Sequence, residues 1–312
     1  MARNWHEVFG TWAKAPSETE EAKGKRAADM ISAAVRASPA LSSKSFDVYS
    51  SGSDRNNTNV RLDSDVDVAL VLKSAVYCAP LPTGLTMEMV GLGGVVTYGL
   101  NEFRKDVGDA LVAKFGAAGV TAGDKAFDVH ENSYRLDADA AVFLEHRRYT
   151  GAKLADGTWE YHRGVEMRPK SDPNKRIINW HDQHYDAGVS RNTATKQRFK
   201  RVTRILKRLR NEMREVGAPA AKEAAANAPS FLLECLAYNA LDTSFNKDEG
   251  SYVADVRAVI ADLHGRLDEQ VADPKFLEVS RFKWLFADGQ PWTRQGARGF
   301  LFHAWHHAGF GG

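Results

Sequence analysis

Residues 65–73, DVDVALVLK, place two aspartates at alternate positions at the start of a β-branched, apolar run. This alternation predicts a strand, because successive side chains of a strand point to opposite faces. Asp65 and Asp67 then share one face, about 7 Å apart at their Cα atoms, while Val66 and Val68 face a core. Two carboxylates this close repel each other unless a cation lies between them. The segment therefore predicts a strand that carries a cation site.

A second acidic pair, Asp137 and Asp139, lies in RLDADAAVF within a predicted strand at 134–149. Either pair alone is more often a solvent-facing feature of an ordinary strand. If the two strands are neighbours, however, three or four carboxylates converge, which is enough for a two-metal site. Such hard oxygen ligands favour magnesium over zinc.

Gly52 and Ser53 end the segment 45–53, which predicts a strand that breaks into a loop at Gly52, ahead of the first acidic strand. A glycine allows the backbone to approach a phosphate closely, and the following hydroxyl and N–H can bind its oxygens. A Gly-Ser dipeptide by itself is usually a turn. Placed twelve residues before Asp65, it predicts a phosphate contact beside the acidic strand.

The two halves of the chain differ in their predicted secondary structure. Caps and hydrophobic periodicity predict helices at 17–37, 97–116, 193–217, 230–241 and 252–271, a further strand at 125–130, and an Ala/Pro connection at 218–229. An α/β first half thus precedes a mostly helical second half. We expect a catalytic lobe with an N-terminal helix at 1–180 and a helical lobe at 181–312 that completes the active-site cleft.

Composition narrows the class of protein. With 43% hydrophobic and 26% charged residues among 312, the chain is an ordinary globular protein. A net charge of only +2 argues against a stable nucleic-acid partner. The two cysteines suit a reducing compartment, and neither a signal peptide nor a membrane-spanning run is predicted. We expect a cytoplasmic, soluble protein.

Several segments match a known family. YSSGSDRNNT (49–58) followed by SDVDVALVL (64–72) resembles the GS…DxD signature of the DNA polymerase β-like nucleotidyltransferase superfamily. RLDADAAVFLEHRRY (135–149), INWHDQHYDAGVSRNTATKQRFK (178–200) and APSFLLECLAYN (228–239) resemble the bacterial cyclic GMP-AMP synthase/DncV-like nucleotidyltransferases, particularly their clade E. The similarity spans roughly residues 45–240.

This resemblance implies an α/β (α+β) fold, in which a polymerase β-like lobe with a mixed sheet packs on a helical C-terminal lobe. It implies a cyclic oligonucleotide synthase that makes a cyclic di- or trinucleotide from nucleoside triphosphates and releases pyrophosphate. The cofactor would be two Mg²⁺ or Mn²⁺ ions. The product would signal phage infection to a downstream effector in bacterial anti-phage defence (CBASS).

The resemblance also implies roles for particular residues. Asp65, Asp67 and Asp139 become the metal-binding catalytic triad, and Asp137 falls outside it. The nucleotide-binding residues would be Gly52, Ser53, Lys200, Arg204, Lys207, Ser230 and Phe231, of which Phe231 stacks on a base. Lys200, Arg204 and Lys207 recur at i, i+4 and i+7, so they form one cationic stripe on a helix. The sequence after Asp139 reads Ala-Ala-Val where relatives read Val-Val-Pro.

Other functions remain as alternatives. One is a template-free RNA-tailing or small-molecule nucleotidyltransferase, and another is a nucleotide-binding module without catalysis. His181/His184 and His303/His306/His307 suggest zinc, but no cysteine lies near them, so we do not expect it. The C-terminal sequence GFGG (309–312) allows conjugation to a target by ubiquitin-like machinery, or is simply a chain end. Which bases, linkage and ring size are used stays open.

Overall fold

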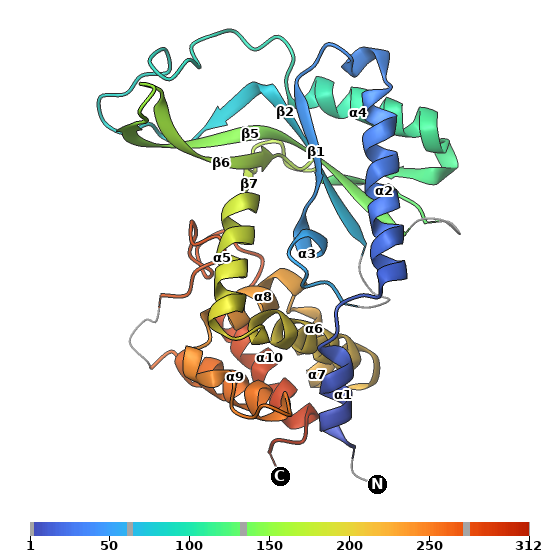
Figure 1. Ribbon diagram of the computed structural model, residues 1–312, viewed down its shortest axis with the longest axis vertical. Coiled ribbons are helices and arrows are strands. Elements are labelled where there is room, and N and C mark those ends of the chain that lie inside the picture. Colours follow the sequence, from blue (N-terminus) through green and yellow to red (C-terminus); the bar gives the residue numbers. More distant parts are fainter. Residues whose placement is uncertain (1–2, 61–64, 132–135, 271–274, 312) are drawn as a thin grey trace. The chain divides into compact units, whose positions relative to one another are not determined.

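The computed structural model describes residues 3–60, 65–131, 136–270 and 275–311 (Figure 1). The chain divides into two compact units, each of which combines segments distant in the sequence. One, here called the sheet unit, comprises Ser17–Arg55 and Asp65–Asp182. The other, the helical unit, comprises Met1–Pro16, Asn56–Ser64 and Gln183–Gly312.

The sheet unit is built on a mixed sheet with the strand order β1-β2-β5-β4-β3, extended by β6 and β7. The strands are β1 Phe46–Ser50, β2 Val66–Cys78, β3 Val120–Ala122, β4 Ala126–Val129, β5 Ala138–Lys153, β6 Trp159–Met167 and β7 Ile177–Asn179. β2 and β5 run parallel, whereas the other pairs are antiparallel. The predicted mixed sheet is confirmed.

Helices α2 (Glu18–Arg36) and α4 (Leu100–Phe115) cover one face of this sheet (Figure 1). α2 begins where predicted, because Ser17 and Glu20 form a capping box in which the Ser17 N–H donates to Glu20 Oε2 at 2.8 Å. Apolar side chains of both helices pack on alternate residues of β2 and β5. The alternation read from the sequence therefore assigns one sheet face to the core and leaves the aspartates on the other.

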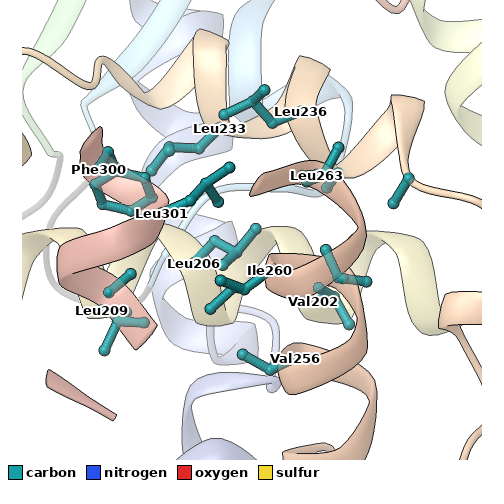
Figure 2. Close-up of a cluster of buried hydrophobic side chains, with 14 of the residues drawn as sticks. Val202, Leu206, Leu209, Leu233, Leu236, Val256, Ile260, Leu263, Phe300 and Leu301 are labelled. Atoms are coloured by element: carbon teal, nitrogen blue, oxygen red, sulfur yellow. The ribbon is translucent and has the colours of Figure 1, made fainter. Parts of the chain in front are cut away.

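The helical unit has its own apolar core, centred on α6 (Arg198–Val216). Figure 2 shows Val202, Leu206 and Leu209 of α6 among side chains of other helices, such as Leu233, Ile260 and Leu301. The remaining α-helices are α1 Trp5–Trp12, α3 Gly52–Arg55, α5 His181–Ala194, α7 Pro219–Ala226, α8 Ser230–Asn239, α9 Val253–Arg266 and α10 Arg294–His307. Short 3₁₀ turns occupy Pro39–Leu41, Ala117–Gly119 and Asp242–Ser244. α3 belongs to the sheet unit, and α5 starts at the unit boundary.

Two local predictions were wrong. Residues 218–229, predicted to be a connection, contain α7, because an alanine-rich run favours helix and Pro219 suits its first turn. The helix predicted at 193–217 begins only at Arg198, since Lys196 and Gln197 adopt positive φ angles of 48° and 66° that end α5. The first residues of the strand predicted at 134–149, and the last of the helix predicted at 252–271, lie outside the described residues.

Among the helices in the described ranges, none combines the length and apolarity that crossing a membrane requires.

Candidate active site

Three adjacent strands of the sheet unit each place an aspartate at the same level. Asp67 on β2 is the register partner of Asp139 on β5, and Asp139 is also the partner of Asp128 on β4. Register partners have Cα atoms only about 5 Å apart. The sequence neighbours of all three aspartates lie in the core beneath α2 and α4, so the aspartates share the opposite face. We call Asp67, Asp139 and Asp128 the acidic row.

Asp65 and Asp137 precede this row by two residues each. They lie immediately before β2 and β5, where the Val66 N–H donates to the Asp137 carbonyl at 3.0 Å. Burial raises the pKa of Asp139, and the charges of Asp65, Asp128 and Asp137 raise it further. The parallel pairing of β2 with β5 confirms that the two acidic segments are neighbours.

Asp128 was not identified from the sequence. Its segment, FDVH, does alternate within a predicted strand, so an acidic residue on the polar face was visible. Its place in the row depends on the register of β4 against β5, which no local pattern specifies. The neighbouring His130 approaches it, with Nε2 3.8 Å from Asp128 Oδ2.

The donor set fits a hard divalent cation, because it consists of carboxylate oxygens whose mutual repulsion such an ion would relieve. Within the part of the chain that the structure describes, no three His, Cys, Asp or Glu side chains already have the spacing of metal ligands. The protein alone therefore gathers the carboxylates without drawing them into a closed coordination shell.

Gly52 lies directly against the acidic row. Its φ is +58°, and a Cβ at this position would overlap the Asp67 carboxylate, so only glycine fits. The Ser51 N–H donates to the Asp67 carbonyl at 2.7 Å and ties the start of α3 to β2. Ser53 follows in the first turn of α3. The Gly-Ser motif is therefore brought next to the aspartates by close packing of backbone on a carboxylate.

A polar cluster lies on the same sheet face. Tyr49 on β1 pairs with Ala69, two residues beyond Asp67. Its hydroxyl is 3.1 Å from Nδ1 of His181, and burial raises the pKa of Tyr49 to about 12. His181, one of the histidines considered for zinc, thus contacts a tyrosine hydroxyl instead.

The cationic stripe that was expected to bind phosphate lies on α6 of the helical unit. Two of its three side chains donate hydrogen bonds to backbone carbonyls of the same unit. Lys207 is only 2% exposed, and its Nζ donates to the Thr58 carbonyl at 3.0 Å. Arg204 Nη1 donates to the Asn57 carbonyl at 2.6 Å. Lys200 is half-buried, with Nζ 5.8 Å from the ring centre of Tyr185. Arg204 and Lys207 therefore meet at residues 57–58.

Ser230 and Phe231 open α8. The Ser230 hydroxyl accepts a hydrogen bond from Arg210 Nη2 at 3.0 Å. Phe231 is 37% exposed, and its ring lies 5.8 Å from those of both His184 and Trp292. An exposed aromatic face supported by two further rings suits stacking on a base.

Known proteins show the same architecture. Residues 186–309 match the cGAS/DncV-like nucleotidyltransferase C-terminal helical domain. The chain is 38% identical to a cyclic dipyrimidine nucleotide synthase CdnE of Legionella pneumophila, covering 98% of this chain and 99% of the relative. It is 32% identical to the enzyme of that name from Cecembia lonarensis, covering 99% and 100%.

A solved structure of the Rhodothermus marinus CdnE c-UMP-AMP synthase, with Apcpp and Upnpp, superimposes with a TM-score of 0.78. It is 30% identical, covering 99% of this chain and 98% of that one. The chain therefore belongs to the cGAS/DncV-like nucleotidyltransferases.

Within that family it is a nucleotidyltransferase of the cyclic oligonucleotide synthase group, acting on nucleoside triphosphates. The predicted family, fold class and enzymatic activity are confirmed.

Proposed function

We propose that Asp65, Asp67 and Asp139 are the catalytic carboxylates with which this enzyme makes a cyclic di- or trinucleotide. The observation that carries this proposal is the pairing of Asp67 with Asp139 on one sheet face, where burial and then neighbouring carboxylates raise the pKa of Asp139. Two Mg²⁺ or Mn²⁺ ions held by the triad would neutralise the negative charge of the triphosphate and activate the attacking hydroxyl. Asp128 borders the triad and adds negative charge to the same row.

The other site residues bind and orient the substrates. The Gly52 backbone and the Ser53 hydroxyl contact the donor triphosphate, and Lys200 and Ser230 contribute further phosphate contacts. Phe231 stacks on a base. A ribose hydroxyl attacks the α-phosphorus in line, so that a phosphodiester bond forms and pyrophosphate leaves. A second attack of the same kind closes the ring.

The relatives suggest which bases are joined. Two full-length relatives are named cyclic dipyrimidine nucleotide synthases, and a third, 35% identical over 64% of this chain, is a cyclic UMP-AMP synthase. We therefore propose that at least one of the two substrates is a pyrimidine nucleoside triphosphate.

The proposed biological role is anti-phage signalling from the cytoplasm, where nucleoside triphosphates are available. The product would activate an effector that arrests or kills the cell. Conjugation through the C-terminal glycine remains part of the proposal, but Gly312 lies outside the described residues.

The test is incubation with each α-labelled nucleoside triphosphate, alone and in pairs, with Mg²⁺ or Mn²⁺, followed by phosphatase. A phosphatase-resistant product is expected, strongest when UTP or CTP is present, and absent from the Asp65→Asn/Asp67→Asn protein. A linear product that phosphatase degrades would instead indicate the tailing activity. A resistant product made equally by the double variant would contradict the assignment of the triad.

A further inference from the structure

Glu234 on α8 is a buried carboxylate, and both of its oxygens contact polar side chains. It is 4% exposed, and its Oε2 accepts a hydrogen bond from the Thr58 hydroxyl at 2.7 Å. Lys207 Nζ lies 3.2 Å from the same oxygen, and His184 Nε2 lies 2.9 Å from Oε1. Burial alone would raise the pKa of Glu234, but Lys207, His184 and Thr58 outweigh it and lower the pKa to about 2. The carboxylate is therefore ionised under all ordinary conditions.

The first consequence of this arrangement concerns residues 56–60, which follow α3 directly. Thr58 binds Glu234 through its hydroxyl and Lys207 through its carbonyl. Asn57, whose φ is +51°, is held by Arg204 through its own carbonyl. The chain immediately after the Gly52–Arg55 turn is thus fixed by a buried network in the helical unit.

The second consequence concerns the aromatic face of Phe231. His184 packs against that ring at a centroid distance of 5.8 Å, and the hydrogen bond to Glu234 fixes the orientation of the imidazole. The same carboxylate therefore holds Thr58, in the segment that follows α3 in the chain, and His184, which packs against Phe231.

Stability alone does not account for this network. A buried ion pair is usually no more stabilising than well-packed apolar residues of the same volume, because both charges lose their hydration. What charges and hydrogen bonds add is a fixed direction for each partner. The polar network lies beside a core that is otherwise apolar, and its partners come from three separate parts of the chain.

We propose that Glu234 is a positioning residue for nucleotidyl transfer. Through Thr58 and Lys207 it sets the segment that follows the Gly-Ser motif. Through His184 it sets the stacking face of Phe231. Lys207 holds the Thr58 segment through its carbonyl. This inference rests on the proposed roles of Gly52, Ser53 and Phe231.

The test compares Glu234→Gln with the double variant Glu234→Gln/Lys207→Met. The single variant leaves a buried lysine without its counter-charge, so its Tm should fall steeply. The double variant is neutral at both positions, so most of the Tm should return. Its kcat should nevertheless remain about 100-fold below wild type, because a displacement of about 1 Å at a reacting centre has an effect of that size. Amide hydrogen exchange at residues 56–60 should be faster than in wild type.

A further variant separates the two arms of the network. His184→Leu removes the support of Phe231 but leaves Thr58 and Lys207 on the carboxylate. We expect KM for the triphosphate to rise about 10-fold, a loss within the range of one base–aromatic contact. The kcat and the exchange at 56–60 should stay within a factor of about 3 of wild type, a change below one tenfold step in barrier.

The matched control is Glu278→Gln. Glu278 is equally buried in the helical unit, but its partners are Lys283 at 3.4 Å and Gln290 at 2.8 Å. Its Tm should fall while kcat, KM and the exchange at 56–60 remain those of wild type. If the folded double variant kept wild-type kcat and wild-type exchange at 56–60, Glu234 would have no positioning role. If wild type itself formed no product, the proposed function would fail, and unchanged exchange in the double variant would still refute the inference.

Discussion

Two carboxylates in this protein occupy opposite electrostatic environments. Asp139 in the sheet unit is half-buried beside other acidic groups, and its pKa is raised by burial and by the charges of Asp65, Asp128 and Asp137. Glu234 in the helical unit is fully buried beside a lysine and a histidine, and its pKa is lowered to about 2. The same chemical group therefore lies beside like charges in one unit and beside opposite charges in the other.

The difference follows from how each unit is assembled. Adjacent strands in register place residues of similar type side by side, so acidic residues at equivalent positions accumulate negative charge. Helices packed around a core bring together side chains of unlike type from distant segments. Carboxylates of like charge thus gather on the sheet, and an internal ion pair arises among the helices.

The largest effect should separate the members of the acidic row. Asp67→Asn removes a triad carboxylate and should lower kcat by about 10³-fold or more, which corresponds to about 4 kcal/mol of transition-state stabilisation. Asp128→Asn, on the same row but outside the triad, should lower kcat less than about 10-fold, or under about 1.4 kcal/mol. Initial rates of pyrophosphate release measure both. Equal losses would mean that the catalytic set extends across β4.

The next effect concerns acid stability. The folded pKa of Glu234, about 2, lies below its ordinary value of 4.5, so its contribution to stability is complete above pH 4.5 and is lost as pH falls toward 2. The contribution is roughly 3 kcal/mol by linkage. Urea unfolding between pH 6 and pH 2.5 should show a shallower loss in the Glu234→Gln/Lys207→Met protein. Parallel curves for the two proteins would contradict the assigned environment.

A smaller effect is expected at the aromatic face. Phe231→Ala should raise KM for the triphosphate by a factor of about 5 to 150, since one base–aromatic contact contributes about 1–3 kcal/mol. Phe302→Ala provides the control, because Phe302 on α10 is also an exposed aromatic, at 48% against 37% for Phe231. Steady-state kinetics at saturating Mg²⁺ distinguish them, and matching KM values would remove Phe231 from the site.

The smallest effect tests whether the sheet is under electrostatic strain without metal. A raised pKa means that ionised Asp139 is disfavoured in the folded state, so its cost appears as pH rises above the ordinary aspartate range. Asp139→Asn should therefore raise Tm in EDTA at pH 7 by on the order of 2 °C. In Mg²⁺ the order should reverse, because only the wild type gains from binding. A lower Tm for the variant in EDTA would show that the carboxylate is stabilised by the chain.

Local features of the chain were predictable where interactions between residues close in the sequence decide them. The alternation in DVDVALVLK placed Asp65 and Asp67 on one strand face, and the Ser17–Glu20 capping box marked the start of α2. The triad candidates and the mixed α/β fold followed from motif order and resemblance. The strand face and the helix cap depend on residues within a few positions of each other, which is the range over which local sequence patterns carry structural information.

Contacts between residues that are distant in the sequence were decided only by the tertiary structure. Asp128 entered the acidic row through the register of β4 on β5, and Lys207 was turned inward by a carboxylate 27 residues away. Thr58 and Glu234, separated by 176 positions, form a hydrogen bond that no periodic sequence pattern predicts. Strand register and helix packing are set by the summed burial of many apolar side chains. The sequence by itself therefore determined which polar and charged groups this protein carries. The packed core determined which of those groups contact each other.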